Sequence, residues 1–465
     1  MRRTLEHYLE NWLIDKCRKP LIIYGARQVG KTYLVDEIFK NKHFDNKHYI
    51  HIDFKFDHES RRYIKNHIDS DEIIEYLALK KNININEETL IFFDEIQECL
   101  PVITSLKSFY EKHSELTVIA TGSLVRTKIK QMETSKKIAL DPEIDREHQD
   151  GHNNYMFPLG KIDECYLYPM NFNEFLFSVN EQLYSYLENS YKNKTDISNE
   201  FHNLALKYVN DYLLIGGLPE NIKIYLETGS YERSRNNLIT LYNNYLNDMV
   251  LYQVSETTIL RSRNIFNSIY SQLTKENKNF KISNIEEQKK FRDYETPFFW
   301  LDQANLIYPS YQIKQRVTLP LSKEESSLFR IYMPDSGLLA YQSGISAENF
   351  INDITASNIS GIFYENFVAC ELRCRNKPLF YWKGKTSSEL EFIIQKNDSI
   401  IPIDVKKNVG NLKSLAKYRE ANTKDIAIKI SSNKYGYNNE SMLYTIPHYF
   451  VGFFFDELFN FSNTL

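Results

Sequence analysis

Cysteine is scarce in this chain, and glycine and proline are few. The 465 residues include 5 dispersed cysteines, which are Cys17, Cys99, Cys165, Cys370 and Cys374. An odd, scattered set does not predict a disulfide framework and favours a reducing compartment. Cys370 and Cys374 lie in an amphipathic helical stretch without His or Cys companions, so no zinc site is expected there.

Long hydrophobic runs and a strong excess of one charge are also missing. The segment 1–17 has no apolar core of the kind that a signal peptide needs, and no run of about 18 apolar residues predicts a membrane span. The expectation is a cytoplasmic protein with no membrane partner. A net charge of -4 and a pI of about 6.3 exclude a globally basic nucleic-acid coat but allow a local basic patch.

The length predicts two to four domains, and the first is an α/β unit over residues 1–170. Short apolar runs alternate there with helical stretches, which is typical of a parallel, doubly wound sheet. The runs are "LIIYG", "HYIHIDF", "TLIFFDEI", "LTVIATGS" and "CYLYPM". Residues 126–154 are polar and without strong periodicity, so we interpret them as an inserted surface loop.

Three further regions follow this unit. Residues 171–255 have helical periodicity that is broken at "IGGLPE". Residues 256–325 combine three helical stretches with "LIYPSYQIKQRV", an order that suits a helix-turn-helix with a β wing. Residues 326–465 return to mixed helix and strand.

The segment "YGARQVGKTYL" carries a complete phosphate-binding motif. Gly25, Gly30, Lys31 and Thr32 fill the pattern G-x4-G-K-[ST] between a predicted strand and a predicted helix. In such a loop the N–H groups face phosphate oxygens, the lysine reaches the β- and γ-phosphates, and the hydroxyl binds Mg²⁺. The predicted nucleotide contacts are Gly25, Ala26, Arg27, Gln28, Val29, Gly30, Lys31, Thr32 and Tyr33.

A buried strand that runs into Asp94 and Glu95 supplies the expected partner of this loop. Asp94 is predicted to hold Mg²⁺, and Glu95 to polarise the attacking water. The next strand ends in "ATGS", where Thr121 or Ser123 could sense the γ-phosphate or simply form a turn. Residues 193–196, "NKTD", match a guanine-reading motif, but no apolar strand precedes them. We therefore expect ATP with Mg²⁺ as the cofactors.

Together with "FFDEIQ", "ATGS", "YPMNFNEFL", "GGLPE", "IYMPDSGLL" and "GIFYENFVACEL", the chain resembles the prokaryotic AAA-type, archaeal-ATPase-like proteins with a C-terminal domain of unknown function. The resemblance covers nearly the whole chain. It implies a P-loop ATPase core, a helical lid, a winged helix and a C-terminal mixed α/β fold related to PD-(D/E)xK nucleases. Where the family often has a short segment ending in Gly-Arg before the run that here reads "YPMNFNEFL", this chain has the long insertion and then Gly160 and Lys161.

The stretch "LEFIIQKNDSIIPIDVKK" predicts a hairpin with its turn at Asn397 and Asp398. That turn pairs Glu391 with Asp404, Phe392 with Ile403, and Glu389 with Lys406. One face is then apolar, with Leu390, Phe392, Ile394, Ile401, Ile403 and Val405, and the other carries the charges. The simple interpretation is an ordinary hairpin with a wet, charged face, although two acids directly across the ladder repel each other.

The second interpretation is a metal-dependent nuclease site. Asp404 and Lys406 have the [D/E]-x-K spacing, Glu391 and Asp404 could bind Mg²⁺, and Lys406 could orient the attacking water. Relative to the family pattern, the two acids are exchanged in type. The resemblance adds Glu365, on the preceding helix, as a third metal ligand.

Basic residues in 256–325 offer nucleic-acid contacts, with protein docking as an equal alternative: Arg261, Arg263, Lys275, Lys278, Lys281, Lys289, Lys290, Arg292, Lys314 and Arg316. The expected partners are nucleic acid, with DNA favoured over RNA, and further copies of the chain. The sequence therefore predicts an ATPase whose nucleotide state controls a nuclease-like domain. The alternative is an ATP-dependent switch or scaffold whose nuclease fold only binds nucleic acid or a partner.

Overall fold

The computed structural model describes residues 1–125, 157–253, 255–322, 328–353, 361–385, 388–408, 410–422 and 426–461. These form two compact units, one of residues 3–168 and one of residues 169–464 with the first two residues. The predicted insertion at 126–154 lies outside the described residues. The finer division of the second unit at residues 255 and 325 stays a prediction.

The first unit is built on a parallel five-stranded sheet of order β2-β3-β4-β1-β5. The strands are β1 (Leu21–Tyr24), β2 (Tyr49–Asp53), β3 (Leu90–Asp94), β4 (Thr117–Gly122) and β5 (Asp163–Tyr166). This confirms the P-loop type of α/β sheet predicted from the alternating pattern. β5 begins two residues earlier than the apolar run at Cys165 suggested, because Asp163 already pairs with Leu21.

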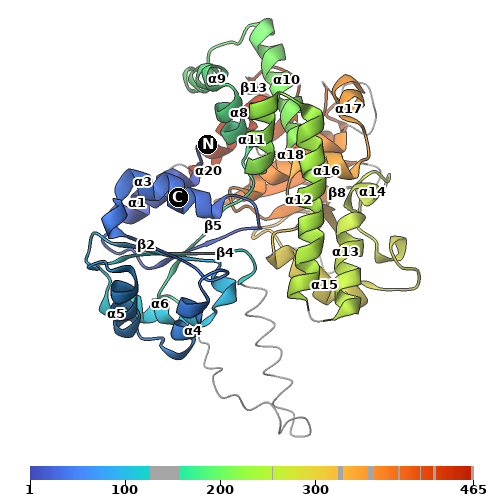
Figure 1. Ribbon diagram of the computed structural model, residues 1–465. Helices are drawn as coiled ribbons and strands as arrows, with labels where there is room; N and C mark the ends of the chain where they lie inside the picture. The colour runs from blue at the N-terminus through green and yellow to red at the C-terminus, as the bar shows by residue number, and fades with distance from the viewer. Residues whose placement is uncertain are drawn as a thin grey trace. The chain divides into compact units, whose positions relative to one another are not determined.

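Helices cover both faces of this sheet (Figure 1). On one side lie α1 (Leu5–Ile14) and α3 (Lys40–His43), and on the other α4 (His58–Asn66), α5 (Ser70–Lys81) and α6 (Pro101–Lys112). The helical segment that follows the phosphate loop comprises α2 (Lys31–Tyr33), the π-helical η1 (Leu34–Phe39) and α3. This segment starts at Lys31, directly after the loop that follows β1, and so places a helix N-terminus at the loop.

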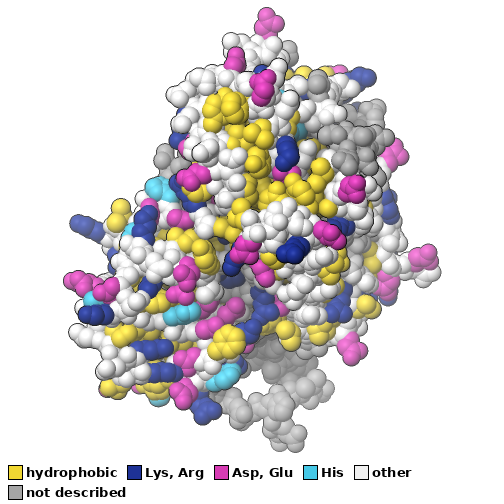
Figure 2. Space-filling model, turned by 45° about the horizontal axis from the view of Figure 1, so that its top comes forward, with side chains coloured by type: hydrophobic (Ala, Val, Ile, Leu, Met, Phe, Trp, Pro, Cys, Tyr) yellow, Lys and Arg dark blue, Asp and Glu magenta, His cyan; other side chains and the backbone are white. Residues whose placement is uncertain are grey.

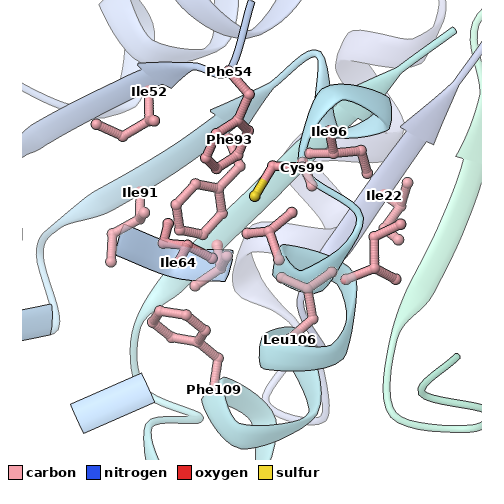
Figure 3. Packing of buried hydrophobic residues seen from close by; sticks show 14 of the residues in the cluster. Ile22, Ile52, Phe54, Ile64, Ile91, Phe93, Ile96, Cys99, Leu106 and Phe109 are labelled. Atoms are coloured by element: carbon pink, nitrogen blue, oxygen red, sulfur yellow. The ribbon is translucent and has the colours of Figure 1, made fainter. Parts of the chain in front are cut away.

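The strand residues alternate between two apolar layers, as β-strands buried on both faces require. Ile22, Ile91 and Phe93 point toward α4, α5 and α6, where they pack with Ile64, Leu106 and Phe109 (Figure 3). The Cys99 side chain is buried in the same cluster, and its pKa rises to about 11 because burial disfavours the thiolate. That thiol is therefore a core side chain rather than a reactive one.

The second unit opens with five helices, as the periodicity predicted. They are α8 (Phe172–Val179), α9 (Glu181–Asn193), α10 (Asn199–Ile215), α11 (Pro219–Thr228) and α12 (Tyr231–Tyr252). The break at "IGGLPE" separates α10 from α11. "NKTD" at 193–196 lies at the end of α9 and in the turn after it, away from any strand, which is consistent with an accidental motif match.

A four-stranded sheet of order β7-β6-β8-β9 follows. Helices α13 (Glu256–Asn267), α14 (Ile269–Leu273) and α15 (Phe291–Gln303) precede β6 (Tyr308–Ile313). β6 pairs antiparallel with β7 (Phe329–Tyr332) and parallel with β8 (Leu379–Lys383). The predicted wing strand is therefore an interior strand of a sheet that continues into the last region of the chain, where β9 (Glu389–Leu390) forms its far edge.

The last sheet has the order β10-β11-β12-β14-β13. Its strands are β10 (Phe392–Lys396), β11 (Ser399–Val405), β12 (Ala427–Ser431), β13 (Gly436–Asn438) and β14 (Leu443–Pro447). The helices of this region are α16 (Ser336–Gln342), α17 (Ala347–Asp353), α18 (Gly361–Arg373), α19 (Lys413–Ala421) and α20 (Val451–Phe459). β11 pairs antiparallel with β10 and parallel with β12, so it lies inside the sheet.

The signature motifs of the second unit contact one another in its core. Gly217 N donates to Asp335 Oδ2 at 2.6 Å, and Met170 N donates to Gly217 O at 2.7 Å. Phe172 N donates to Glu371 Oε1 at 2.9 Å. A Cβ atom on Gly217 would lie 2.0 Å from Met170 O, so only glycine fits. These motifs hold the unit together.

Within the described residues, none of the helices combines the length and the apolar character that crossing a bilayer requires. On the face shown in Figure 2, basic and acidic side chains of the described residues are interspersed, and neither sign covers a continuous area.

Candidate functional site

The loop after β1 has the backbone geometry that its sequence predicts. Gly25 packs so closely on the chain leaving β5 that a Cβ atom there would lie 2.2 Å from Leu167 O. Gln28 and Gly30 have φ values of 65° and 92°, in the left-handed region. These turns bring the segment from Gly25 to Tyr33 around the N-terminus of α2, where N–H groups and the helix dipole favour phosphate.

Lys31 lies in the position from which a P-loop lysine reaches phosphate. It is buried, with 7% of its surface exposed, and its Nζ donates to Gly25 O at 3.0 Å and to Ala26 O at 2.8 Å. The ammonium is thus held at the mouth of the loop by two carbonyls. A phosphate anion is a stronger partner for it than two neutral oxygens.

Asp94, at the end of β3, accepts hydrogen bonds from helix α2 and from strand β4. Thr32 Oγ1 donates to Asp94 Oδ2 at 2.6 Å, and Thr121 Oγ1 donates to Asp94 Oδ1. β4 lies between β1 and β3, so Thr121 comes from the strand between the loop and the acid. Burial alone raises the pKa of Asp94, but the groups that bond its ionised form outweigh burial and hold the pKa low. Thr32 and Asp94 therefore provide adjacent oxygens suited to Mg²⁺.

Glu95 and Ser123 lie beside this network. Glu95 has φ 53° and accepts a hydrogen bond from Gln97 Nε2, while Gln97 Oε1 accepts one from Ser123 N at 3.3 Å. Gln97 thus bridges the predicted water-activating acid and the end of β4. Ser123 Oγ is buried without a hydrogen-bond partner in the described part of the chain.

Sequence reasoning missed two residues here. His51 Nε2, on β2, lies 3.8 Å from Asp94 Oδ2, too far for a hydrogen bond but close enough for electrostatic attraction when protonated. Arg3 reaches the loop from the start of the chain, 26 residues before its acceptor Val29.

Lys161, which the sequence analysis singled out, lies against Glu111 at 3.5 Å and over the Tyr110 ring at 5.0 Å.

The hairpin in the second unit has the predicted turn and register. Phe392 pairs with Ile403 and Lys396 with Ser399, leaving Asn397 and Asp398 as the turn. The antiparallel ladder ends at the pair Phe392 and Ile403. Glu391 nevertheless lies next to Asp404, because its Oε2 accepts a 2.9 Å hydrogen bond from Val405 N. The two acids and the lysine thus converge as predicted.

The simple interpretation, an ordinary hairpin whose charged face is exposed to solvent, is wrong. Asp404 is 0% exposed and Glu391 is 6% exposed, because the sheet continues through β12 and helix α18 packs against β11. Leu390 was also assigned to the wrong face, since it packs with Ile393 rather than with Phe392. The chain bends at Glu391 between β9 and β10, and this bend interrupts the alternation.

Glu389 does not face Lys406, contrary to the predicted register. It pairs with Lys383 in the other sheet, and its carboxylate forms an ion pair with the buried Arg330. Arg330 also lies 4.0 Å over the ring of Tyr381. The register failed here because β9 leaves the hairpin and joins β8.

Two lysines neutralise the acids of the predicted nuclease site. Lys406 Nζ lies 2.5 Å from Asp404 Oδ1 and 3.7 Å from Glu391 Oε1. Lys278 Nζ lies 2.5 Å from Glu365 Oε1 on α18. Lys278 was grouped with the nucleic-acid contacts on sequence grounds, but in the structure it is half-buried and pairs with this carboxylate. Arg261 and Arg263 are likewise bonded to backbone carbonyls of Asp293 and Leu246.

The cluster titrates unusually because it is buried. Desolvation raises the pKa of both Glu365 and Glu391, with the nearby lysines only partly opposing it. Burial alone lowers the pKa of Lys406, but the carboxylates of Glu391 and Asp404 outweigh it and raise that pKa. His448 packs beside this region with its Nε2 at 3.1 Å from Lys406 O.

Among the described residues, no group of three or more His, Cys, Asp or Glu side chains is arranged to hold a metal ion. Buried oxygens nevertheless lack hydrogen-bond partners within that part of the chain, namely Glu365 Oε2 and both oxygens of Asp404. Lys406 Nζ forms an ion pair with Asp404 Oδ1, but the geometry of this contact is not that of a hydrogen bond. Oxygen donors of this kind fit Mg²⁺ chemically once Lys278 and Lys406 move.

Residues 17–138 match the AAA domain family. The first unit has the P-loop NTPase fold, with a parallel sheet of order β2-β3-β4-β1-β5 and the matched region over most of it. Residues 206–349 and 360–449 match two domains of unknown function, DUF8612 and DUF4143. The chain is 25% identical over 433 residues to the uncharacterized protein MJ1544 of Methanocaldococcus jannaschii, covering 90% of this chain and 82% of that protein.

Among solved structures, the chain is similar to the Walker-type ATPase PabY2304 of Pyrococcus abyssi, with a TM-score of 0.43 and 16% sequence identity. That similarity covers 74% of this chain and 95% of the other.

Proposed function

We propose that this protein hydrolyses ATP at its phosphate loop and that its nucleotide state controls a Mg²⁺-dependent nuclease-like site in the second unit, acting on nucleic acid. The observation that carries the proposal is the convergence of the buried acids Glu391, Asp404 and Glu365 with Lys406 in one cluster. DNA is the favoured substrate.

At the ATP site, each group has a defined role. The loop from Gly25 to Tyr33 would bind the phosphates, with Lys31 exchanging its two carbonyl partners for phosphate oxygens. Thr32 and Asp94 would hold Mg²⁺, which supplies charge neutralisation at the phosphates when bound. Glu95 would accept a proton from the attacking water, and Gln97, Thr121 and Ser123 keep the acid and the strand end in place.

At the second site, the bound divalent cation would supply a lowered pKa for its water and polarise the phosphate. Asp404, Glu391 and Glu365 would provide oxygens for it. Lys406 would orient the water or offset charge on the phosphate, because it already lies within reach of both hairpin acids. Lys278 must leave Glu365 before that carboxylate can bind a cation.

A second candidate function has one observation in its favour. Lys278 and Lys406 already neutralise the acids, and no group of three acidic or His/Cys side chains in the described residues is arranged for a metal. In that case the second unit would bind nucleic acid or a protein partner without cleaving it, and ATP would switch its binding.

A nuclease assay with Mg²⁺ or Mn²⁺ distinguishes these functions. We expect the wild type to cleave DNA, Lys406→Ala to lose cleavage, and the neighbouring Lys407→Ala to retain it as a matched control. Equal cleavage by the wild type and Lys406→Ala would exclude catalysis at this site. No cleavage by any of the three would favour the binding switch.

A further inference from the structure

Arg3 connects the start of the chain to the phosphate loop. Its side chain is buried, with 4% of its surface exposed. Nη1 donates to Val29 O at 2.7 Å, and Nη2 donates to Tyr168 O at 2.6 Å. Both of these acceptors are backbone carbonyls, so the two hydrogen bonds depend on the path of the main chain at Val29 and Tyr168.

The bond to Val29 O determines the orientation of a loop N–H group. The peptide unit between Val29 and Gly30 is planar and trans, so its C=O and N–H point in opposite directions. A phosphate-binding loop needs its N–H groups turned inward, which leaves its carbonyls turned outward in need of donors. By binding Val29 O from behind, Arg3 directs the Gly30 N–H toward the phosphate position.

The bond to Tyr168 O ties the same loop to the segment by which the chain leaves the first unit. This unit ends at Tyr168. Leu167 N donates to Tyr24 O at 2.7 Å, and Leu167 O lies against Gly25 so closely that no side chain fits. The loop therefore touches the exit segment at its beginning through Gly25 and near its end through Arg3.

We propose that Arg3 is a positioning residue for the phosphate loop: it orients the Val29–Gly30 peptide for phosphate binding and couples the loop to the exit segment. This inference rests on the proposed binding of ATP at the loop and adds a residue outside the motif. The planar fork of arginine suits two acceptors at once, whereas lysine carries a single ammonium group.

Binding of ADP and adenosine to the full chain tests this role. The comparison uses the wild type, Arg3→Met, Arg3→Lys and Arg18→Met. Arg18 is the matched control, because it also donates to backbone carbonyls of this unit, at Leu13 O and Glu115 O, both at 3.0 Å. Fluorescent ADP is titrated directly, adenosine is measured by competition, and melting temperatures record folding.

We expect Arg3→Met to lower the affinity for ADP by about tenfold or more while the affinity for adenosine is kept, because only ADP carries the phosphates that the loop binds. Arg3→Lys should lose less affinity for ADP, since the lysine can still donate to one of the two carbonyls and the fold is kept. Arg18→Met should leave the ratio of the two affinities unchanged.

An unchanged ratio in both Arg3 variants would overturn the role of Arg3 while leaving ATP binding intact. An equal loss of ADP and adenosine affinity, matched by Arg18→Met, would reduce Arg3 to a purely structural residue. Absence of ADP binding by the wild type would overturn the ATP assignment and this inference together.

Discussion

The N–H of Val405 donates a 2.9 Å hydrogen bond to Glu391 Oε2. Val405 lies between Asp404 and Lys406, so this bond fixes the Glu391 carboxylate beside both groups although the strand ladder has ended. If the second site is nuclease-like, its two acids are exchanged in type, which changes the reach of each side chain by about one methylene. The hydrogen bond holds the longer acid in place.

Removing the ammonium of Lys31 should abolish tight ATP binding. Lys31→Ala loses the charge that faces the phosphates, and charge-assisted hydrogen bonds contribute about 1.5–3 kcal/mol each. The affinity for ATP should fall by roughly tenfold to a hundredfold, measured by titration of the full chain. Lys47→Ala, at an exposed lysine of the same unit, should bind ATP normally. Equal affinities in the two variants would contradict the loop assignment.

Lys278 should compete with a divalent cation at Glu365. Lys278→Met keeps the length of the side chain but removes the ammonium that lies 2.5 Å from Glu365 Oε1. Mn²⁺ affinity, measured by calorimetry, should rise by about tenfold, because a charge-assisted partner of the carboxylate is gone.

The exposed Lys275 provides the control for that experiment. Lys275→Met should bind Mn²⁺ as the wild type does. If Lys278→Met binds Mn²⁺ no better than Lys275→Met, the cluster is a structural ion pair and not a blocked cation site.

Asp335 should matter for stability and not for nucleotide binding. Its carboxylate accepts hydrogen bonds from Gly217 N at 2.6 Å and Leu338 N at 3.0 Å. Asp335→Ala leaves both buried N–H groups without a partner, and we expect a loss of about 2 kcal/mol or more in unfolding free energy. Denaturant unfolding and ATP titration measure the two effects. The exposed Glu440→Ala is the control, and a large loss of ATP affinity in Asp335→Ala would contradict a purely structural role.

His448 should make stability depend on pH. Burial lowers its pKa from 6.5 to about 3. Between these values the unfolded chain binds a proton that the folded chain excludes, so stability falls as the pH drops through this window. The slope from this group approaches about 1.4 kcal/mol per pH unit. His448→Gln keeps a donor for Lys406 O but does not titrate, so its stability should fall less between pH 7 and pH 5. An identical pH profile for both proteins would show that His448 does not contribute.

Local patterns were sufficient to predict some features, because those features depend on residues that are close together in the sequence. The loop from Gly25 to Thr32 needs glycines at fixed spacing, and the turn at Asn397 and Asp398 sets a register that the strands kept from Phe392 onward. The same pattern failed at Glu389, where the chain changed sheets. Alternation along a strand cannot reveal which neighbouring strand it will join.

Contacts distant in sequence could not be predicted in this way. Lys278 reaches Glu365 across 87 residues, and Arg3 reaches Tyr168 across 165. A lone basic residue in an open pattern suggests a solvated or phosphate-binding side chain, and only the tertiary fold shows which group of the protein it pairs with. A sequence signal for Arg3 exists only in hindsight, as an arginine just before an amphipathic helix.

The most direct test of the account is DNA cleavage in Mn²⁺ by the wild type, Lys31→Ala and Lys406→Ala, each with ATP and with ADP. If nucleotide state controls the second site, cleavage by the wild type differs between ATP and ADP, Lys31→Ala loses that difference, and Lys406→Ala does not cleave. Cleavage that is lost in Lys406→Ala but proceeds in the wild type and Lys31→Ala at the same rate with either nucleotide would contradict the central claim.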